Sequence, residues 1–549
     1  MNMDTFPQHK AARIEASTAM VWVAAFAIVV VVALLFLQAP HGGAFYWSDA
    51  PRHALNGVFV KDLLLDLPLD DPAGYAYRYY AQYPALTILF YPPLFYAISA
   101  PFYALLGVSH ETALFVVFLH YVAYGLGCFA LARFWLSAMP SLAFALLMVL
   151  LPEVAFWGRQ VMLEIPAFAF LVWSAVALMR YVRGAPVGWL YLCAALLVCA
   201  LYTKISVAYV GLVYLIVLLQ REGLGLFRNK HVYAVALLSA VALIPLLVLT
   251  VKFGQANVQS VTGVADAVAS RRSLEAWLWY ARQIPSQVGW VVTVVACMGI
   301  VYACLQTWRK SESVKALPFW ALWFVIGYLF FSSIDLKEAR HSVFLLAAVA
   351  FVAVWFLDTL LSKQLAAGAL CLAVASTAAA TVLDRPVFYV KGYAEVVDLV
   401  AKQAPRDSVV LFSGYRDGSF VFNMRAREDR RDLSVLRADK ILLSVAVRRE
   451  LGVEEKDLSE GEIAQTLNDN GVHYVVMQPG FWTDLEAMRR FERVMATPQF
   501  EEVARIATPA NHKAHETELV VFRNLGKVGP KPERLNIELK IINRTISTQ

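Results

Sequence analysis

A long uncharged run near the N-terminus, residues 16–38, constrains the fold of this chain most strongly. It exceeds the roughly 20 apolar residues that a helix needs to cross a bilayer, and similar runs recur over the first two thirds of the sequence. Of the 549 residues, 59% are hydrophobic and only 16% are charged, whereas soluble proteins have about 45–50% and about 25%. This excludes a soluble enzyme, a secreted disulfide scaffold and a disordered chain, and predicts a polytopic α-helical membrane protein.

Charge and cysteine usage narrow the class further. The net charge is only +6, and no basic block suited to nucleic acid is present. No cysteine pair has metal-ligand or disulfide-framework spacing, so the cysteines are interpreted as small residues facing lipid or the core. All six lie inside apolar runs: Cys128, Cys193, Cys199, Cys297, Cys304 and Cys371.

The basic residues between apolar runs predict the topology. If all twelve apolar segments crossed, every short basic connection would lie outside, against the positive-inside rule. Removing segment 84–107, which contains four prolines, places these connections on the same side as Lys10 and Arg13. Successive prolines break a helix, and such a segment is expected to be half-buried or interfacial. The eleven remaining crossings are 19–37, 112–132, 134–152, 165–181, 187–202, 205–220, 232–251, 288–306, 317–334, 342–361 and 365–383.

The predicted architecture has a transmembrane domain, residues 1–383, and a second domain, residues 384–549. The first run is longer than the roughly 7–15 residues of a signal-peptide core, which favours an uncleaved helix. Residues 38–110 then form a long external loop with juxtamembrane helices. From residue 384 on, helical patterns (393–403, 462–470, 484–495) and strand patterns (408–412, 472–477, 518–523) alternate. They predict an external α/β domain without a phosphate loop, interpreted as a structural or acceptor-positioning cap; the tail after Gly526 is expected to be partly disordered.

Ionisable residues beside apolar runs are functional candidates, because burying them is costly. Under the predicted topology, four clusters of such residues face the external side. They contain Asp49, Arg52 and His53 in the first; Arg159 and Glu164 in the second; Lys204 alone in the third; and Lys337, Arg340 and His341 in the fourth.

Each cluster also has a structural interpretation. Asp49 is suited to cap the following helix, and Lys204 to snorkel to the bilayer surface. The second cluster is able to pair internally or with lipid head groups, and the fourth to anchor a helix at the interface. The location of all four on one face favours the functional interpretation.

The order of these clusters resembles the GT-C superfamily of integral-membrane glycosyltransferases. It is most similar to the branch of lipid A aminoarabinose transferases, protein O-mannosyltransferases and bacterial lipopolysaccharide glycosyltransferases. Departures from the family pattern are Ala50 beside the first acid, Tyr91 before the proline pair, and glutamate at position 164. The matching stretches are Ser48-Asp49-Ala50-Pro51-Arg52-His53, Phe90-Tyr91-Pro92-Pro93-Leu94-Phe95-Tyr96, Glu164-Ile165-Pro166, Thr203-Lys204 and Lys337-Glu338-Ala339-Arg340-His341.

The resemblance implies an inverting glycosyltransferase of the bacterial inner membrane, with its active site and C-terminal domain in the periplasm. The donor is a polyprenyl-phosphate-linked sugar, the acceptor a glycan, lipid or protein, and no cofactor is expected. The sequence itself shows no Asp-x-Asp metal pair beside Asp49, so no metal is expected either. Asp49 is the expected general base. Arg52, His53 and Glu164 would orient it or bind the acceptor. The donor phosphate would be bound by Arg159, Lys204, Lys337, Arg340 and His341.

Two other classes of function remain open. A transporter or lipid flippase should show repeat symmetry and ionisable residues near the membrane midplane, and the sequence shows neither. A non-catalytic scaffold or polymer-export subunit would leave Asp49 only as a helix cap. In that case Asp49→Asn would leave the cellular phenotype unchanged.

Overall fold

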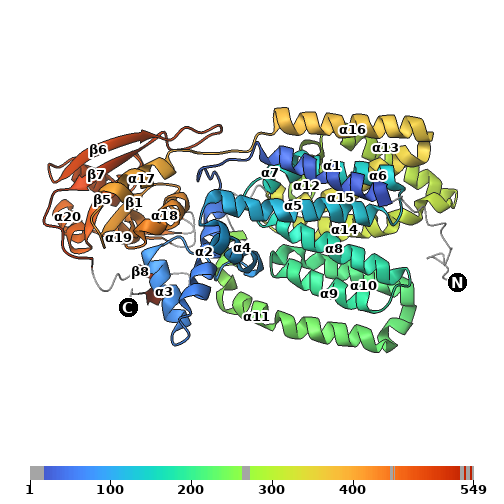
Figure 1. The fold of residues 1–549 in the computed structure, drawn as a ribbon, viewed down its shortest axis with the longest axis horizontal. Coiled ribbons are helices and arrows are strands. Elements are labelled where there is room, and N and C mark those ends of the chain that lie inside the picture. The colour runs from blue at the N-terminus through green and yellow to red at the C-terminus, as the bar shows by residue number, and fades with distance from the viewer. Residues whose placement is uncertain are drawn as a thin grey trace. The chain divides into compact units, whose positions relative to one another are not determined.

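A computed structural model describes residues 18–261, 273–445, 449, 452–531, 537–539 and 544–546. Lys10, Arg13 and Pro532 lie outside the described residues. The chain forms two compact units (Figure 1). The helical unit comprises Met1–Ala39, Val117–Lys252 and Val261–Val387, and the sheet unit comprises Pro40–Val116, Phe253–Ser260 and Phe388–Gln549. A separate domain starting at residue 384 stays a prediction.

Long apolar helices make up the helical unit, as the sequence predicts for an integral membrane protein. Within the described residues, nine helical segments have the length and composition to cross a membrane, or ten if the bent pair α6–α7 is one span. The helices are α1 (Thr18–Phe36), α5 (His110–Ala132), α6 (Ala138–Leu150), α7 (Pro152–Gly158), α8 (Glu164–Val182), α9 (Gly188–Leu201), α10 (Tyr209–Glu222), α11 (Lys230–Val261), α12 (Leu274–Val288), α13 (Trp290–Trp308), α14 (Leu317–Ser332), α15 (Leu346–Leu360) and α16 (Lys363–Asp384).

Each of the eleven predicted crossings coincides with a helix, but α9 has only 14 residues. At 1.5 Å per residue it is shorter than the roughly 30 Å hydrocarbon core, so the count by length is nine or ten. The α6–α7 pair bends by 60° at Pro152, which lacks the N–H needed to continue a helix. The excluded segment contains α4 (Leu94–Leu106), a short apolar helix that does not qualify as a span.

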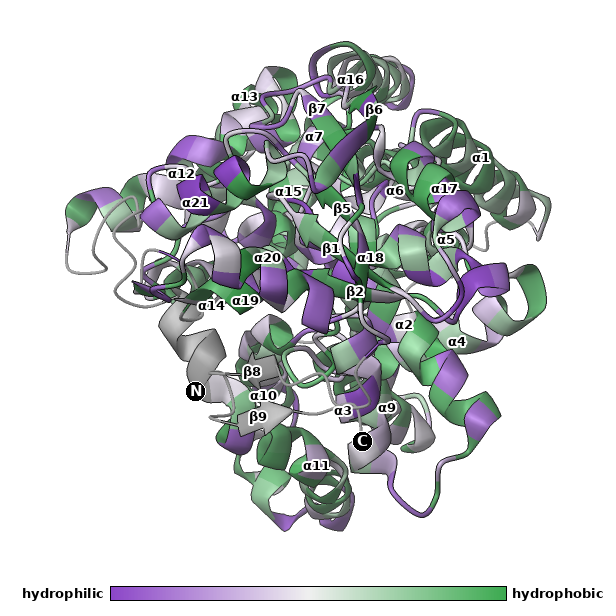
Figure 2. Cartoon of the chain, turned by 90° about the vertical axis from the view of Figure 1, so that its left-hand side faces the viewer, coloured by the Kyte–Doolittle hydropathy of each residue, from purple (hydrophilic) through white to green (hydrophobic). Residues whose placement is uncertain are grey.

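Burial differs strongly among the spans. In α8, 83% of the apolar window is buried, whereas in α11 only 6% is, so α8 lies in the core and α11 presents its apolar side chains outward. Aromatic side chains fill the core: Trp320 stacks on Phe351 with ring centroids 4.7 Å apart, and Phe144 packs edge-on against both. In Figure 2, α1 is largely hydrophobic, whereas α20 (Glu460–Asp469) and α21 (Glu486–Met495) carry hydrophilic residues.

The sheet unit contains a five-stranded mixed sheet in the order β2-β1-β5-β7-β6. Strand β1 is parallel to β2 and β5, and β7 is antiparallel to β5 and β6. All six predicted helices and strands are confirmed. The sheet strands are β1 (Val409–Ser413), β2 (Ser434–Arg437), β5 (Val472–Met477), β6 (Phe500–Ala507) and β7 (Glu518–Asn524); the other elements are α17 (Tyr393–Gln403), α18 (Asp417–Ala426), α19 (Ala438–Leu442), β3 (Leu443–Val445), β4 (Val453–Glu455), β8 (Ile537–Leu539) and β9 (Arg544–Ile546).

Helices from the predicted external loop, residues 38–110, belong to the same unit. They are α2 (Asp49–Asp66), α3 (Pro72–Gln82) and α4. Helices α2 and α4 pack closely, since a Cβ added at Gly57 would lie 2.8 Å from Tyr103 and 3.2 Å from Ser99. The glycine permits this approach, so α2 has a fixed place against α4.

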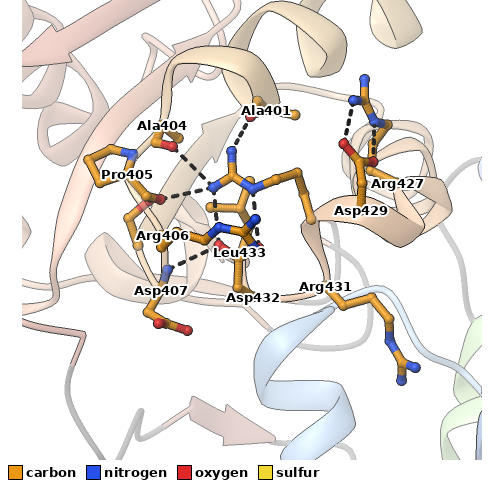
Figure 3. Close-up of polar contacts among 12 residues, drawn as sticks. Ala401, Ala404, Pro405, Arg406, Asp407, Arg427, Asp429, Arg431, Asp432 and Leu433 are labelled. Carbon is orange, nitrogen blue, oxygen red and sulfur yellow. Dashed lines mark hydrogen bonds and ion pairs between the residues drawn. The ribbon is translucent and has the colours of Figure 1, made fainter.

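An arginine-rich segment after α18 connects several elements of the sheet unit. Arg430 donates to the carbonyl oxygens of Ala404 and Pro405 at 3.1 and 2.9 Å, just after α17 ends. Arg427 pairs with Asp429, while the side chain of Arg431 points away from this cluster (Figure 3). Arg430 also donates to the Ala401 carbonyl in the last turn of α17, so one arginine provides donors to backbone carbonyls at and just after the end of this helix.

Candidate active site

Asp49 is the first residue of α2, and Ser48 precedes it as the N-cap residue without a side-chain capping bond. The carboxylate therefore lies in the first helical turn, where the helix dipole favours negative charge, and the interpretation of Asp49 as the N-cap itself is wrong. The Tyr91 hydroxyl donates to Asp49 Oδ1 at 3.0 Å. Tyr91 comes from the proline-pair segment, so the two motifs that carry the resemblance meet within the sheet unit.

His53 lies behind this pair, one helical turn after Asp49. It is only 2% exposed, its Nδ1 shares a 2.8 Å hydrogen bond with the Tyr96 hydroxyl, and its ring centroid is 4.7 Å from that of Tyr91. Burial raises the pKa of Tyr96, so this hydroxyl remains protonated. The arrangement supports Tyr91 from within, whereas His53 was expected to orient the base or bind the acceptor.

Arg52 forms an ion pair within the sheet unit. Its Nη2 lies 2.9 and 2.8 Å from the two carboxylate oxygens of Asp417, and its Nη1 donates to the Ser48 carbonyl at 2.7 Å. The expected role of Arg52 in orienting the base or binding the acceptor stays a prediction. The observed contacts hold the first turn of α2.

A second group of charges lies in the helical unit. Glu164 begins α8 and is completely buried, and its Oε1 lies 2.7 Å from Lys204 Nζ. Lys204 follows the C-terminal end of α9, and its side chain retains 19% exposure. The pair explains why Lys204 is not simply a snorkelling residue. The structural interpretation of the second cluster included an ion pair between Glu164 and Arg159. The structure instead pairs Glu164 with Lys204.

Arg340 lies near the same pair. Its guanidinium is 5.8 Å from the ring centroid of Trp157 and forms an ion pair with Glu338, and it interacts electrostatically with Glu164. His341 Nε2 is 3.7 Å from Glu338 Oε2. Lys204, Arg340 and His341 are thus the predicted phosphate ligands that retain partial exposure beside an acidic partner.

Arg159 and Lys337 are in a different situation, because backbone carbonyls take up their donors. Arg159 is 1% exposed and donates to the carbonyls of Ala155 and Arg385 at 2.8 and 3.2 Å. Lys337 is 4% exposed and donates to the Ser332 carbonyl at 2.7 Å at the end of α14. Burial lowers the pKa of Lys337, and nearby Asp335 opposes this shift. These contacts lie at helix ends, and phosphate binding by either residue stays a prediction.

Arg385 was not singled out from the sequence, and Tyr91 was noted only as a departure from the family pattern. Arg385 Nη2 lies 2.6 Å from the buried Glu153, which also accepts from Trp157 Nε1 at 2.6 Å. Arg385 is the first basic residue after the last apolar run. This position could have marked Arg385 as a candidate, but the sequence does not indicate that Glu153 is its partner. Within the described residues, no group of three or more His, Cys, Asp or Glu side chains is arranged to hold a metal ion.

Comparison with known proteins identifies the fold. Residues 91–249 match the family model of dolichyl-phosphate-mannose-protein mannosyltransferases; this range includes Tyr91, Glu164 and Lys204 but not Asp49. No curated protein matches the chain. The crystal structure of ArnT from Cupriavidus metallidurans bound to undecaprenyl phosphate is similar over 94% of this chain and 100% of that chain, with a TM-score of 0.60 and 14% identity. By fold, this chain is similar to the ArnT glycosyltransferase structures.

A second ArnT structure supports this identification. The apo form from the same organism gives a TM-score of 0.60 at 15% identity, again over 94% and 100% of the two chains. The GT-C resemblance and the predicted fold class, a polytopic helical protein with an additional α/β part, are therefore confirmed. At this level of identity the likeness concerns the fold. The roles of individual residues in this chain rest on its own geometry.

Proposed function

We propose that this chain transfers a sugar from a polyprenyl-phosphate-linked donor to a hydroxyl acceptor at the periplasmic face of the bacterial inner membrane. The fold supports this proposal, because the similar ArnT structure holds undecaprenyl phosphate. The family model supports it as well, because its description names a sugar donor linked to a lipid phosphate. The observation that carries the proposal is the Asp49 carboxylate, oriented by Tyr91 at the start of α2.

Asp49 is the proposed general base. The acceptor oxygen forms a bond with the anomeric carbon of the sugar, the bond from that carbon to the phosphate oxygen breaks, and polyprenyl phosphate leaves. Asp49 takes the proton of the acceptor hydroxyl and later releases it to water. One direct displacement of this kind inverts the anomeric configuration. A phosphate leaving group needs no proton donor, so one carboxylate is sufficient.

Lys204 and Arg340 are proposed to stabilise the negative charge that develops on the departing phosphate. Cations in a site with little water stabilise such charge strongly, and arginine offers two parallel donors to phosphate oxygens. Glu164 holds Lys204 Nζ at 2.7 Å, which fixes the lysine for this contact. Other predicted ligands, Arg159 and Lys337, would first have to release their carbonyl partners.

Replacing Lys204 by glutamine is expected to lower kcat/KM for the donor about 10- to 100-fold, because a charge-assisted hydrogen bond contributes roughly 1.5–3 kcal/mol. Initial rates measured at varied donor concentration in vesicles give this ratio. Lys230→Gln, at the exposed start of α11, is the matched control and should behave as wild type. Equal kcat/KM values for Lys204→Gln and wild type would contradict phosphate binding by Lys204.

Release of free polyprenyl phosphate tests the proposed function itself. The protein reconstituted in vesicles is given a panel of polyprenyl-phosphate sugars together with a crude envelope acceptor. We expect one donor to be cleaved and its sugar to appear on the acceptor. Movement of intact donor across the vesicle membrane without cleavage of any donor would contradict the proposal and support a flippase.

A further inference from the structure

The first turn of α2, which carries Asp49, is connected to α18 and β2 by a continuous chain of ion pairs within the sheet unit. Arg52 Nη2 donates to both carboxylate oxygens of Asp417, at 2.9 and 2.8 Å. Arg437 at the end of β2 pairs with Asp417 at 2.5 Å and with Asp439 at 2.7 Å. We call this set, Arg52, Asp417, Arg437 and Asp439, the ion-pair network.

The ion-pair network contacts the backbone next to the proposed base. Arg52 Nη1 donates at 2.7 Å to the carbonyl of Ser48, the residue before Asp49. The same guanidinium therefore contacts Asp417 with one nitrogen and the N-terminal end of α2 with another. A shift of Asp417 is transmitted to the residue adjacent to Asp49 through this planar, rigid group.

The ion-pair network is largely shielded from water, so each charged side chain depends on its partner for stabilisation. The side chains of Asp417 and Asp439 are 9% and 8% exposed, and those of Arg52 and Arg437 are 18% and 17% exposed. Burial by itself would raise the pKa of Asp417, but the charges of Arg437 and Arg52 outweigh it and the pKa is lowered. Removing one charge leaves its partner without compensation in a poorly solvated place.

A glycine provides a second, independent observation at the same contact. A Cβ added at Gly418 would lie 3.0 Å from Pro51 Cγ, 3.3 Å from Arg52 Nη1 and 3.5 Å from the Ser48 carbonyl. The start of α18 therefore approaches the start of α2 so closely that any side chain at position 418 would press on it. The close packing at Gly418 involves Ser48, Pro51 and Arg52, and Arg52 also forms the ion pair with Asp417.

We propose that Asp417 is a positioning residue for Asp49, acting through Arg52 and supported by Arg437 and Gly418. This inference rests on the proposed function, because Asp49 is taken as the general base. It assigns a defined role to α18 and β2, which the sequence suggests only as part of a cap. A displacement of about 1 Å in a catalytic group costs roughly 100-fold in rate. Loss of the ion-pair network should therefore reduce turnover even though Asp417 acts on Asp49 and does not itself contact the substrate.

The test uses the full-length protein in vesicles and compares four variants with wild type. Asp417→Asn is expected to lower kcat 10- to 100-fold and to leave the KM for the polyprenyl-phosphate sugar within twofold. Arg52→Lys keeps the charge but loses the forked contact, and it should give a smaller fall in kcat. Arg52→Lys combined with Asp417→Asn should be no slower than the slower single variant, since both act through one contact. Arg505→Gln, which breaks an exposed pair with Glu518, is the control and should match wild type.

Thermal unfolding of each variant separates positioning from general loss of structure. A kcat for Asp417→Asn and Arg52→Lys equal to that of wild type would overturn the inference while leaving the proposed function intact. A fall in kcat that follows the loss of folded protein, or that is accompanied by an equal rise in KM, would also overturn it. If wild type and Arg505→Gln release no polyprenyl phosphate from any donor, the proposed function fails, and the inference fails with it.

Discussion

Replacing Asp49 by asparagine is expected to lower kcat for sugar transfer by about 10²–10⁴-fold, the usual contribution of a general base. Asparagine keeps the size of the side chain and its oxygen acceptor for the Tyr91 hydroxyl, which lies 3.0 Å from Oδ1 in the native site. It cannot accept the proton of the acceptor hydroxyl. The rate should therefore fall while the donor still binds, because the proposed phosphate ligands Lys204 and Arg340 are unchanged.

The measurement is the rate of polyprenyl phosphate release together with competition by free undecaprenyl phosphate for the donor site. Asp66→Asn is the matched control, since Asp66 is the last residue of the same helix and its side chain is 40% exposed. It should retain wild-type turnover. Wild-type turnover in Asp49→Asn would exclude Asp49 as the base, and loss of competition by undecaprenyl phosphate would show that the variant damages donor binding.

The second large effect concerns stability. Asp62 and Arg425 are both completely buried, and Arg425 Nη2 lies 2.8 and 2.6 Å from the two carboxylate oxygens. The Tyr79 hydroxyl also donates to Asp62 Oδ2 at 2.9 Å. Removing one partner of a buried ion pair costs about 3–5 kcal/mol, because the remaining charge is left uncompensated. Asp62→Asn should therefore destabilise the packing of α2 on α18 by this amount.

Hydrogen exchange of the backbone amides in α2 and α18 measures this loss locally, where a single unfolding free energy for a large membrane protein would not be defined. Protection should fall in both helices and remain unchanged in α8. The exposed Asp66→Asn variant should change protection by less than about 1 kcal/mol. Unchanged protection of α2 and α18 in Asp62→Asn would show that this ion pair does not hold the two helices together.

Regular patterns explain why much of the fold follows from the sequence. Uncharged runs position the spans, and the prolines before Leu94 explain why α4 is short. Strand β5 is predictable because Val472–Met477 is mostly apolar, follows Gly471 and is followed by Pro479 one residue further on. Helix α18 was not identified, because its Phe420-Val421-Phe422 run has no helical period and Gly418 lowers helix propensity. Strand β6 was not identified because its residues are mostly exposed or half-buried and lack a continuous apolar run.

The candidate site follows from the sequence only in part. The positions of Asp49, Glu164 and Lys204 are suggested by charges beside apolar runs and by the family resemblance. Their partners are not predictable in the same way, since Arg52 and Asp417 are 365 residues apart in the chain. Tyr91 replaces a basic residue of the family pattern, so the sequence marks it as a departure, whereas the geometry makes it the hydrogen-bond donor to Asp49.

The anomeric configuration of the transferred sugar tests the central claim, a direct displacement from a lipid phosphate assisted by Asp49. The donor that wild type cleaves is prepared with a defined anomeric configuration, and the product on the acceptor is analysed by nuclear magnetic resonance. We predict that the configuration is inverted and that Asp49→Asn forms the same product about 10²–10⁴-fold more slowly. A retained configuration would contradict the account, because it requires a covalent sugar–enzyme intermediate and a second displacement.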